Sequence, residues 1–363
     1  MNGFLEPGDP APWFVAPTLD KPQFHFSSVG GRHVMLLFVA SAGSAQAQAA
    51  LATLMAHRKL FDDRRACFFG VTNDPEDVGQ QRIAHLMPGI RWFLDPDQSI
   101  ARRFRAVGPA GLTQPHWLVC DPMLRVIGRA AIDAGEKLFG FLRARLGRPE
   151  PDVPAPVLQI PNIFEPAFCR RLIDLYEENG GRPSGFMREV DGKTVGVMDA
   201  AVKRRNDYHI DGDDILREQI RARLTRFLLP QIERAFQFRA TRLERYVVAC
   251  YDGSEGGFFR PHRDNTTAGT AHRRFACTIN LNADDYEGGD LVFPEFGSRR
   301  YRAPTGGAVV FSCSLLHEAT PVTRGRRYAC LPFLYDDAAA RQREAISRSG
   351  KVSAELANYR ADA

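Results

Sequence analysis

Hydrophobic positions in the first 146 residues form short runs separated by segments of mixed polarity. HVMLLFVA from His33 and ACFFGVT from Ala66 have the length of buried strands, whereas AQAQAALATLMAHRKLF from Ala45 has the mixed pattern of a helix. Three further apolar runs follow: IRWFLD, HWLVCD and RVIGRA. Apolar strands that alternate with amphipathic helices predict an α/β domain built on a buried sheet.

The pattern changes after residue 156. Two helical segments, PAFCRRLIDLYEENG and DDILREQIRARLTRFLLPQIERAF, precede the strands RYVVACYD, FACTINLN, DLVFPE, AVVFSCS and RYACLPFLY. Gly- and Asp-rich turns separate these strands, which is typical of antiparallel barrels and sandwiches. We therefore expect helices that back an antiparallel barrel or sandwich.

A proline-rich stretch, GRPEPDVPAPVLQIPN at residues 147–162, separates the two patterns. Its prolines prevent a continuous helix and stiffen the chain. We therefore expect one domain over residues 1–147, a linker over 148–156, a second domain over 157–336 and a helical, Ala- and Arg-rich tail over 337–363.

Composition narrows the classes of protein. The 363 residues, 44% of them hydrophobic, suffice for two domain cores, and the balance of 48 basic against 43 acidic residues gives a net charge of +5. This mild charge, without a basic stripe interleaved with aromatics, argues against nucleic-acid binding. No apolar run approaches the roughly 20 residues that span a bilayer, and the first residues do not have a signal-peptide pattern. The seven cysteines are scattered and never spaced C-x-x-C. This favours a reducing, cytoplasmic setting over a disulfide framework or a zinc ribbon.

Candidate metal ligands occur in RPHRDNTTAG at residues 260–269. On a strand that runs into a turn, His262 and Asp264 point to the same side and can bind one metal together. The third ligand must then come from a distant strand, and His317 is the best candidate because it follows the apolar strand GGAVVFSCSLL. His209 precedes the strand series and His272 lies in a polar loop. Two imidazoles and one carboxylate on one face of a metal are typical of non-heme iron sites with open coordination positions.

An arginine follows the third ligand by ten residues. Arg327 opens the strand RYACLPF, and a guanidinium inside a barrel needs an anionic partner, for which a bidentate carboxylate is suited. The metal triad and Arg327 together predict a dicarboxylate ligand that reaches from one to the other. Strand alternation lets only one of Arg326 and Arg327 face inward.

Three segments in this order carry a family resemblance: YDGSEGGFFRPHRDN, INLNADDYEGGDLVFPE and LLHEATPVTRGRRYA. With them, residues 156–335 resemble the 2-oxoglutarate- and Fe(II)-dependent dioxygenases, in particular the prolyl hydroxylase-like branch. The resemblance implies an α+β double-stranded β-helix, or jelly-roll, with iron bound by His262, Asp264 and His317. It also implies that Arg327, rather than Arg326, binds the distal carboxylate of 2-oxoglutarate with help from Tyr251. Asn280 stands where the oxygen-sensing prolyl hydroxylases have a second tyrosine, so the carboxylate contacts on that side depart from the family pattern.

The implied activity is hydroxylation of a C–H bond with Fe(II), 2-oxoglutarate and O2, with release of succinate and CO2. A prolyl residue of a protein or peptide is the favoured substrate, and a small molecule is the alternative. Asp264 favours hydroxylation, since related halogenases lack this carboxylate. The nearby Arg263, Arg273 and Arg274 would contact an acidic segment or the backbone of the substrate. A competing hypothesis is a non-catalytic redoxin-like scaffold whose barrel binds a metal without turnover.

The first domain has a resemblance of its own. GDPAPWFVAPTLDKPQF followed by HVMLLFVASAGSAQAQAAL is similar to the start of a peroxiredoxin-type thioredoxin fold, over about residues 5–146. A peroxidatic cysteine is activated at a helix N-terminus, but here the Ser/Thr-x-x-Cys pattern reads Ser44 to Ala47. Cys67 and Cys120 lie in apolar runs and are expected to be buried. We therefore expect no peroxidase activity, and instead a partner-docking, substrate-presenting or homodimerising role. A peroxidase that uses Cys67 is the alternative.

Overall fold

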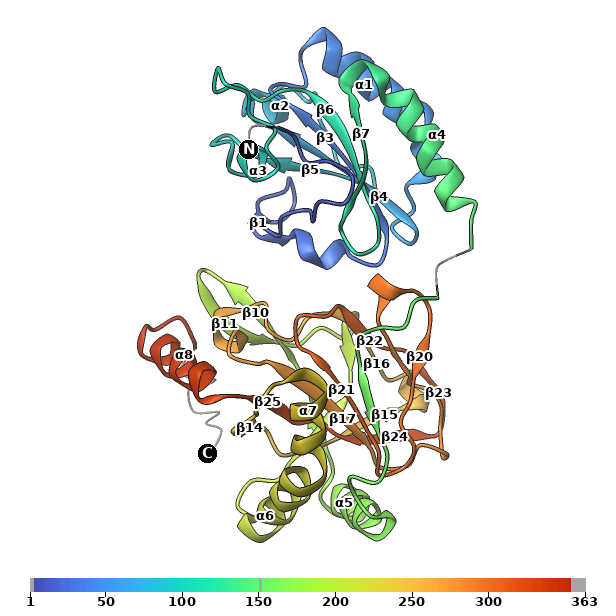
Figure 1. Cartoon of the computed structure of the whole chain (residues 1–363), viewed down its shortest axis with the longest axis vertical. Helices are drawn as coiled ribbons and strands as arrows, with labels where there is room; N and C mark the ends of the chain where they lie inside the picture. Colours follow the sequence, from blue (N-terminus) through green and yellow to red (C-terminus); the bar gives the residue numbers. More distant parts are fainter. Residues whose placement is uncertain (1–2, 150–151, 354–363) are drawn as a thin grey trace. The chain divides into compact units, whose positions relative to one another are not determined.

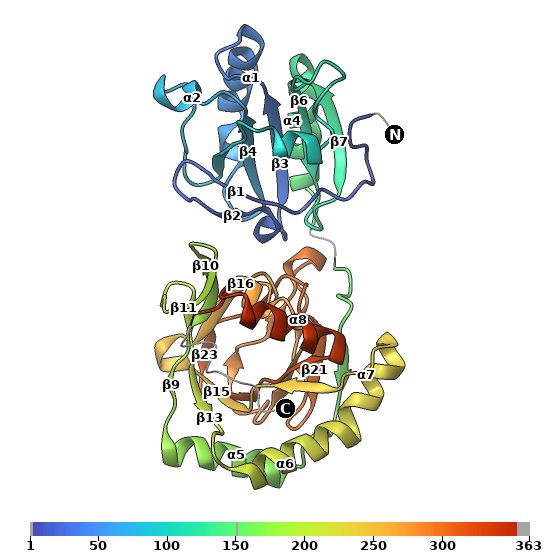
Figure 2. The same cartoon turned by 90° about the vertical axis from the view of Figure 1, so that its left-hand side faces the viewer.

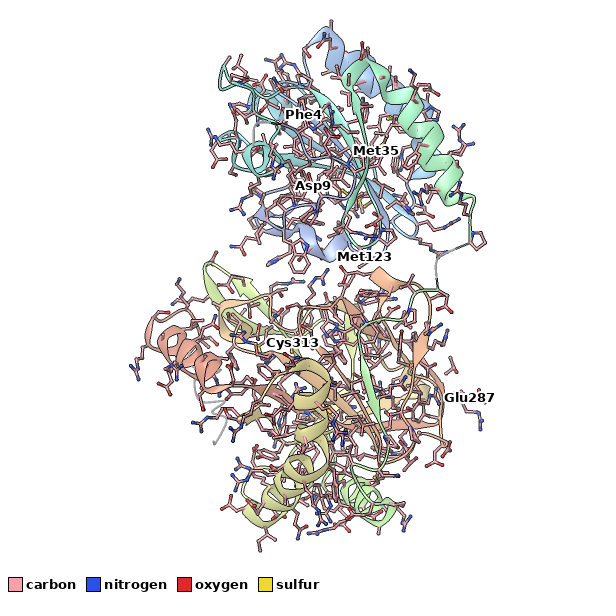
Figure 3. The ribbon with its side chains drawn as sticks, in the orientation of Figure 1. Phe4, Asp9, Met35, Met123, Glu287 and Cys313 are labelled. Atoms are coloured by element: carbon pink, nitrogen blue, oxygen red, sulfur yellow. The ribbon has the colours of Figure 1, made fainter. Side chains whose placement is uncertain are left out.

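The computed structural model describes residues 3–149 and 152–353, which divide into two compact units (Figure 1). The first unit contains the residues up to Asp152 together with Pro294–Gly297, and the second contains the rest of the chain from Val153. Met35 is fully buried in the first unit and Cys313 in the second, whereas Glu287 is exposed (Figure 3). Within the described residues, no helix is long and apolar enough to cross a membrane.

The first unit is built on a five-stranded sheet with the order β5-β4-β3-β6-β7. Its strands are β3 (His33–Val39), β4 (Ala66–Thr72), β5 (Ile90–Leu94), β6 (His116–Cys120) and β7 (Val126–Ala131). β3, β4 and β5 are parallel, whereas β6 and β7 are antiparallel to their neighbours. The unit also contains the short strands β1 (Val15–Ala16) and β2 (Phe24–His25) and the α-helices α1 (Ala45–Ala56), α2 (Glu76–Gly79), α3 (Ser99–Arg103) and α4 (Gly135–Leu146).

Both faces of this sheet are buried, as the apolar strands predicted. Alternate residues of β3 enter different clusters: Val34, Leu36 and Phe38 pack on one face, and Met35, Leu37 and Val39 on the other. Helices α1 and α4 cover the second face through residues such as Leu54 and Phe139. This is the thioredoxin-like α/β architecture that the sequence predicted.

The second unit consists of two facing antiparallel sheets with helices on one side. The larger sheet contains β8 (Leu158–Ile160), β9 (Arg182–Pro183), β13 (Asn206–His209), β14 (Arg242–Glu244), β15 (Val247–Asp252), β17 (Phe275–Asn280), β21 (Ala308–Ser312), β24 (Arg326–Cys330) and β25 (Phe333–Tyr335). The smaller sheet contains β12 (Lys203–Arg204), β16 (Phe258–His262), β19 (Leu291–Val292), β20 (Arg300–Tyr301) and β22 (His317–Ala319). This is the predicted double-stranded β-helix.

The helices of this unit are α5 (Pro166–Asn179), α6 (Asp214–Arg223), α7 (Leu229–Phe236) and α8 (Asp337–Arg348), with a π-helical turn at Leu224–Leu228 between α6 and α7. Helices α5, α6 and α7 lie along one side of the sheets (Figure 2). Val248 and Cys250 of β15 pack in the core on the helical side, and Val247 and Ala249 therefore face the interior between the sheets. This alternation decides which residues of β15 and its neighbours can reach an interior site.

Two antiparallel strand pairs complete the unit: the hairpin of β10 (Phe186–Val190) with β11 (Lys193–Val197), and the long-range pair of β18 (Glu287–Gly288) with β23 (Val322–Arg324). The strand predicted at DLVFPE is limited to β19, and the following Pro294–Phe296 form a 3-10 turn. The predicted linker falls between α4 and β8, with residues 150–151 outside the described part of the chain. Helix α8 lies in the predicted tail, whose residues 354–363 also lie outside it.

Candidate metal and co-substrate site

The three predicted metal ligands lie together at one end of the smaller sheet. His262 ends β16 and His317 opens β22, and the antiparallel register places these two residues directly opposite each other. Asp264 follows two residues after His262, and its backbone N–H donates to Cys313 O at 3.0 Å. The Asp264 carboxylate lies 3.5 Å from His262 Nε2 and 3.4 Å from His317 Nε2. Among the described residues, His262, Asp264 and His317 form the group of possible metal ligands whose ligand atoms all lie within 4.8 Å of one another.

Backbone carbonyls orient both imidazoles. His262 Nδ1 lies 2.7 Å from Arg260 O, and His317 Nδ1 lies 3.0 Å from Leu315 O. Each Nδ1 must carry the proton to donate to a carbonyl, so each Nε2 presents a lone pair toward Asp264. Phe259 stacks on the His262 ring, with a centroid distance of 3.5 Å, and helps to fix its orientation.

The charge states suit a divalent metal. Burial, and then the neighbouring His262, lower the pKa of His317 to about 4, so this imidazole is neutral near pH 7. Burial opposes ionisation of Asp264, but the adjacent His317 and His262 outweigh it and lower the pKa of this carboxyl group. Two imidazoles and one carboxylate on one side of a common point are a donor set that fits Fe(II).

Arg327 and Tyr251 lie side by side in the interior. They are register partners on β24 and β15, and the Arg327 guanidinium carbon lies 5.0 Å from the Tyr251 ring centroid. Arg327 is 2% exposed, whereas its neighbour Arg326 is exposed and bonds to Glu177 at 2.9 Å. Strand alternation thus turns Arg327, and not Arg326, inward.

The Arg327 guanidinium has unused donors. Among the described residues, neither Nε nor Nη1 has a hydrogen-bond partner. A buried guanidinium without an anion costs several kcal/mol, roughly the desolvation penalty of an unpaired charge. This arrangement fits a ligand that brings a carboxylate to Arg327.

Tyr286 is a residue of this site that the sequence interpretation missed. It is 4% exposed and packs with Tyr251 and Val322, and its hydroxyl has no partner among the residues described. A Cβ atom at Gly289 would lie 3.0 Å from Arg327 Cδ and 3.3 Å from Tyr286 Cε2, so this glycine leaves space between the two side chains. The sequence did contain a signal for Tyr286. It lies in INLNADDYEGGD, part of a segment on which the family resemblance rests, but the resemblance was not used to give this tyrosine a role.

Two other predicted neighbours have defined partners. Asn280 faces the interior, and its Nδ2 donates to Ala303 O at 2.7 Å. The Tyr251 hydroxyl accepts from Arg205 Nη1 at 3.3 Å, which leaves its own proton for donation. Arg205 itself is buried in an ion pair with Asp207 at 2.6 Å. The Asn280 amide nitrogen is thus engaged by a backbone carbonyl, whereas its Oδ1 has no partner among the described residues.

His209 and His272, which were not selected as metal ligands from the sequence, lie outside the triad. His272 is buried against Glu244, with an Nε2 to carboxylate distance of 2.7 Å, and His209 lies on β13. The predicted basic neighbours also have partners: Arg273 bonds to Glu244 at 2.6 Å, and Arg274 donates to Ala271 O at 2.8 Å. Arg263 donates to Ser314 O.

Family models match both parts of the chain. Residues 246–335 match the 2OG-Fe(II) oxygenase superfamily, and residues 7–128 match the AhpC/TSA family. A PKHD-type hydroxylase of Cupriavidus metallidurans is 29% identical over 188 residues, which are 48% of this chain and 75% of that protein. A PKHD-type hydroxylase of Klebsiella pneumoniae is 35% identical over 150 residues, 39% of this chain and 64% of that protein.

Solved structures give matches to each part. A prolyl hydroxylase of Trichoplax adhaerens, in complex with a peptide of the hypoxia inducible factor oxygen degradation domain, has a TM-score of 0.39 at 18% identity. It covers 52% of this chain and 86% of its own. Mycobacterium tuberculosis AhpC has a TM-score of 0.33 at 14% identity, covering 40% of this chain and 97% of its own.

The second unit therefore carries a 2OG-Fe(II) oxygenase domain, and the chain is a 2-oxoglutarate-dependent dioxygenase, as the sequence predicted. An AhpC/TSA domain precedes this oxygenase domain in the same chain. The oxygenase family implies Fe(II), 2-oxoglutarate and O2 as cofactor and co-substrates.

Proposed function

We propose that the chain is an Fe(II)- and 2-oxoglutarate-dependent hydroxylase that acts on a prolyl residue of a protein or peptide and releases succinate and CO2. The main support is the arrangement of the His262, Asp264 and His317 group beside the unpaired, buried Arg327. The names of the PKHD-type relatives support hydroxylation. The prolyl substrate rests on the sequence resemblance to the prolyl hydroxylase-like branch, and a small-molecule substrate is the alternative.

In this proposal, His262 and His317 bind Fe(II) through Nε2 and Asp264 through a carboxylate oxygen. The bound metal would supply activation of O2 coupled to decarboxylation of 2-oxoglutarate. The backbone bonds from each Nδ1 keep the Nε2 lone pairs directed at the metal position. Three protein ligands leave coordination positions for the keto acid and for O2.

The interior side chains would hold the other end of 2-oxoglutarate. Arg327 offers two N–H groups without partners among the described residues, and Tyr286 and Tyr251 offer hydroxyl protons close by. A carboxylate can accept hydrogen bonds from the guanidinium and from both phenols. Holding the distal carboxylate fixes the direction of the keto acid toward the metal ligands.

Substitution of Arg327 tests this site directly. We expect Arg327→Gln to weaken binding of 2-oxoglutarate at least about 30-fold, because truncating a buried charged pair costs roughly 2 kcal/mol or more. Arg326→Gln is the matched control, since Arg326 is adjacent in sequence but exposed, and it should bind within about threefold of wild type. Calorimetry of the full chain with Zn(II), which supports no turnover, measures both affinities.

Succinate formation completes the test. Full-length protein loaded anaerobically with Fe(II) and exposed to air should convert 2-oxoglutarate to succinate, and His317→Ala should not. Equal losses of affinity in the two arginine variants would contradict the assigned carboxylate site. Wild-type protein that binds 2-oxoglutarate without producing succinate in the presence of proline-containing peptides would favour the non-catalytic scaffold.

For the first unit, we propose a role in partner docking, substrate presentation or homodimerisation, in a domain that ends at residue 147. The linker 148–156 then leads to the oxygenase domain 157–336 and the tail 337–363. Ala47 in place of a reactive cysteine supports a role other than peroxide chemistry. Free thiols at all seven cysteines support a cytoplasmic setting.

A further inference from the structure

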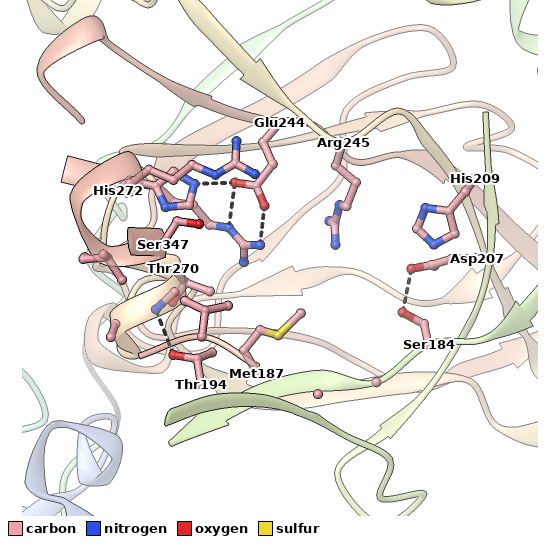
Figure 4. Close-up of a pocket in the computed structure, with 18 of the residues that line it drawn as sticks. Ser184, Met187, Thr194, Asp207, His209, Glu244, Arg245, Thr270, His272 and Ser347 are labelled. Atoms are coloured by element: carbon pink, nitrogen blue, oxygen red, sulfur yellow. Dashed lines mark hydrogen bonds and ion pairs between the residues drawn. The ribbon is translucent and has the colours of Figure 1, made fainter. Parts of the chain in front are cut away.

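A cavity of about 380 Å³ opens in the second unit (Figure 4). Its walls are the hairpin β10–β11, residues 268–273 after the Asp264 turn, part of α8, and the inner face of the larger sheet at Asp207 and His209. None of the three proposed metal ligands lines it. Its size suits a small metabolite or one to two peptide residues.

Two wall residues connect the cavity to the site. Arg273 Nη1 lies 3.5 Å from the backbone carbonyl of Asp264, and Asp207 holds Arg205, which donates to the Tyr251 hydroxyl. A molecule in the cavity is therefore separated from Asp264 by the Arg273 side chain, and from Tyr251 by the side chains of Asp207 and Arg205.

The carboxylates in the wall are already paired. Asp207 accepts from Arg205 at 2.6 and 2.7 Å and from Ser184 Oγ at 2.6 Å. Glu244 bonds to Arg273 at 2.6 Å and to His272 at 2.7 Å. Each acid is thus neutralised by its own partners, which occupy both oxygens of each carboxylate.

Arg245 is a lining cation that belongs to neither of these paired groups. In Figure 4 its side chain enters the cavity between the Glu244 group and Asp207. Its Nε and Nη2 donate to Leu331 O at 3.2 and 3.1 Å, and its guanidinium lies 4.6 Å from the Phe333 ring centroid. Within the described residues, Arg245 forms no ion pair with a carboxylate, and its Nη1 group makes no hydrogen bond.

The backbone at this position is unusual. Arg245 has a φ of +77°, a left-handed backbone conformation that residues other than glycine seldom adopt. Such strain persists when neighbouring structure holds it, and it is concentrated at ligand-binding positions. Here it places the long side chain over the cavity rather than along the sheet edge. Burial, and then the nearby Arg205, lower the pKa of Arg245, while Asp207 and Glu244 oppose this shift.

We propose that this cavity binds the substrate of the oxygenase through a carboxylate that pairs with Arg245, so that the substrate class is an amino-acid or peptide unit bearing a carboxylate. This inference rests on the proposed hydroxylase function and specifies its substrate. The guanidinium edge that Leu331 leaves free can bind a carboxylate bidentately. Met187 and Met198 on the hairpin side supply adaptable apolar contact for the hydrocarbon part of the molecule.

The test compares matched probes that differ in one charge. N-acetylproline and N-acetylprolinamide differ at a terminal carboxylate, whereas acetyl-aspartyl-prolinamide and acetyl-asparaginyl-prolinamide differ at a side-chain carboxylate. Calorimetry measures the dissociation constant of each probe for full-length protein loaded with Zn(II) and 2-oxoglutarate. We expect the anionic member of at least one pair to bind 10-fold or more tightly than its neutral partner, and the responding pair identifies the source of the carboxylate.

Variants then assign the preference to Arg245. Arg245→Gln should abolish the discrimination within the responding pair, Arg245→Lys should retain part of it, and Arg326→Gln should leave it unchanged. If the Arg245 variants do not fold, hydrogen exchange of the wild-type protein is compared with and without the anionic probe. Protection by the anionic probe over β10–β11 and residues 268–273 supports the cavity, and protection elsewhere rejects it.

Failure of this inference can be told apart from failure of the proposed function. Wild-type protein that binds 2-oxoglutarate and forms succinate, but binds both members of each pair equally or binds none of the four probes, overturns the carboxylate inference alone. Wild-type protein that does not bind 2-oxoglutarate overturns the proposed function, whatever the probes do.

Discussion

Burial controls the charge of single histidines in both units. His116, on β6 of the first unit, stacks on Phe38 at a centroid distance of 5.0 Å, and its Nδ1 lies 2.8 Å from Gln114 O. Its Nε2 is buried and has no partner among the described residues. Burial lowers the pKa of His116 to about 4, so the folded unit contains a neutral imidazole.

This histidine should make the first unit sensitive to acid. The unfolded chain takes up a proton below about pH 6.5, while the folded unit resists until about pH 4. Stability is therefore lost as the pH falls between these values, by about 2 kcal/mol from pH 7 to pH 4.5. His116→Phe should reduce the pH dependence of the free energy of unfolding by this amount.

Tryptophan fluorescence during chemical denaturation measures the effect. All three tryptophans of the chain, Trp13, Trp92 and Trp117, belong to the first unit, so the signal reports on that unit. Equal pH dependence in wild type and His116→Phe would show that other groups control the acid sensitivity.

At the scale of elements, local sequence could predict strands but not every hairpin. The β10–β11 hairpin was not predicted because its strands are short and mixed in polarity. Its turn did carry a signal: Asp191 and Gly192 have φ values of +49° and +72°, as Asp-Gly does in a tight hairpin turn. This hairpin supplies one wall of the cavity, so the element that was not predicted belongs to the proposed substrate site.

The antiparallel pair β18–β23 depends on glycine. Gly288 and Gly289 have φ values of +73° and +67° at a register shift of this pair. A Cβ atom at Gly288 would overlap Pro321 O. Gly288→Ala should therefore destabilise the second unit by at least about 3 kcal/mol, through left-handed strain together with a backbone clash.

Gly212→Ala separates these two contributions. Gly212 has φ +79°, but no described atom lies within 4 Å of its Cβ position, so this variant should lose only about 1 kcal/mol. Far-UV circular dichroism during denaturation measures both variants. Equal losses would mean that strain alone, without the clash at Pro321, accounts for the requirement for glycine.

Over the whole molecule, the sequence predicted the features that depend on short spacing and strand alternation. The fold class of both units depends on strand patterns that are visible along the chain. Alternation alone left Arg326 and Arg327 open, and the family resemblance selected Arg327. The partners of interior polar groups depend instead on contacts between distant segments. Glu244 meets His272 and Arg273 only because β14 pairs with β25 beside β17, and Tyr286 reaches Arg327 only across the glycine at 289. Arg245 was missed for the same reason, since its lack of a carboxylate partner among the described residues depends on the ion pairs around it.

The whole chain combines an oxygenase domain with an AhpC/TSA domain that has no reactive thiol at the expected helix. Ser44 caps α1 by accepting from the Ala47 N–H at 3.2 Å, so the local turn is formed while the third residue of the helix is a buried alanine. Cys67 and Cys120 are fully buried, and burial raises the pKa of Cys67 to about 12. A thiol of that pKa is almost never ionised at pH 7 and cannot attack peroxide.

We therefore expect that the full chain, freed of metal by chelation and supplied with dithiothreitol, consumes hydrogen peroxide no faster than the reagents alone. Cys67→Ala should give the same rate as wild type. Chelation matters because an iron-loaded oxygenase site could consume peroxide independently of any cysteine. Peroxide consumption that persists after chelation and disappears in Cys67→Ala would instead establish a thiol peroxidase, and would require Cys67 to become exposed through opening of the first unit.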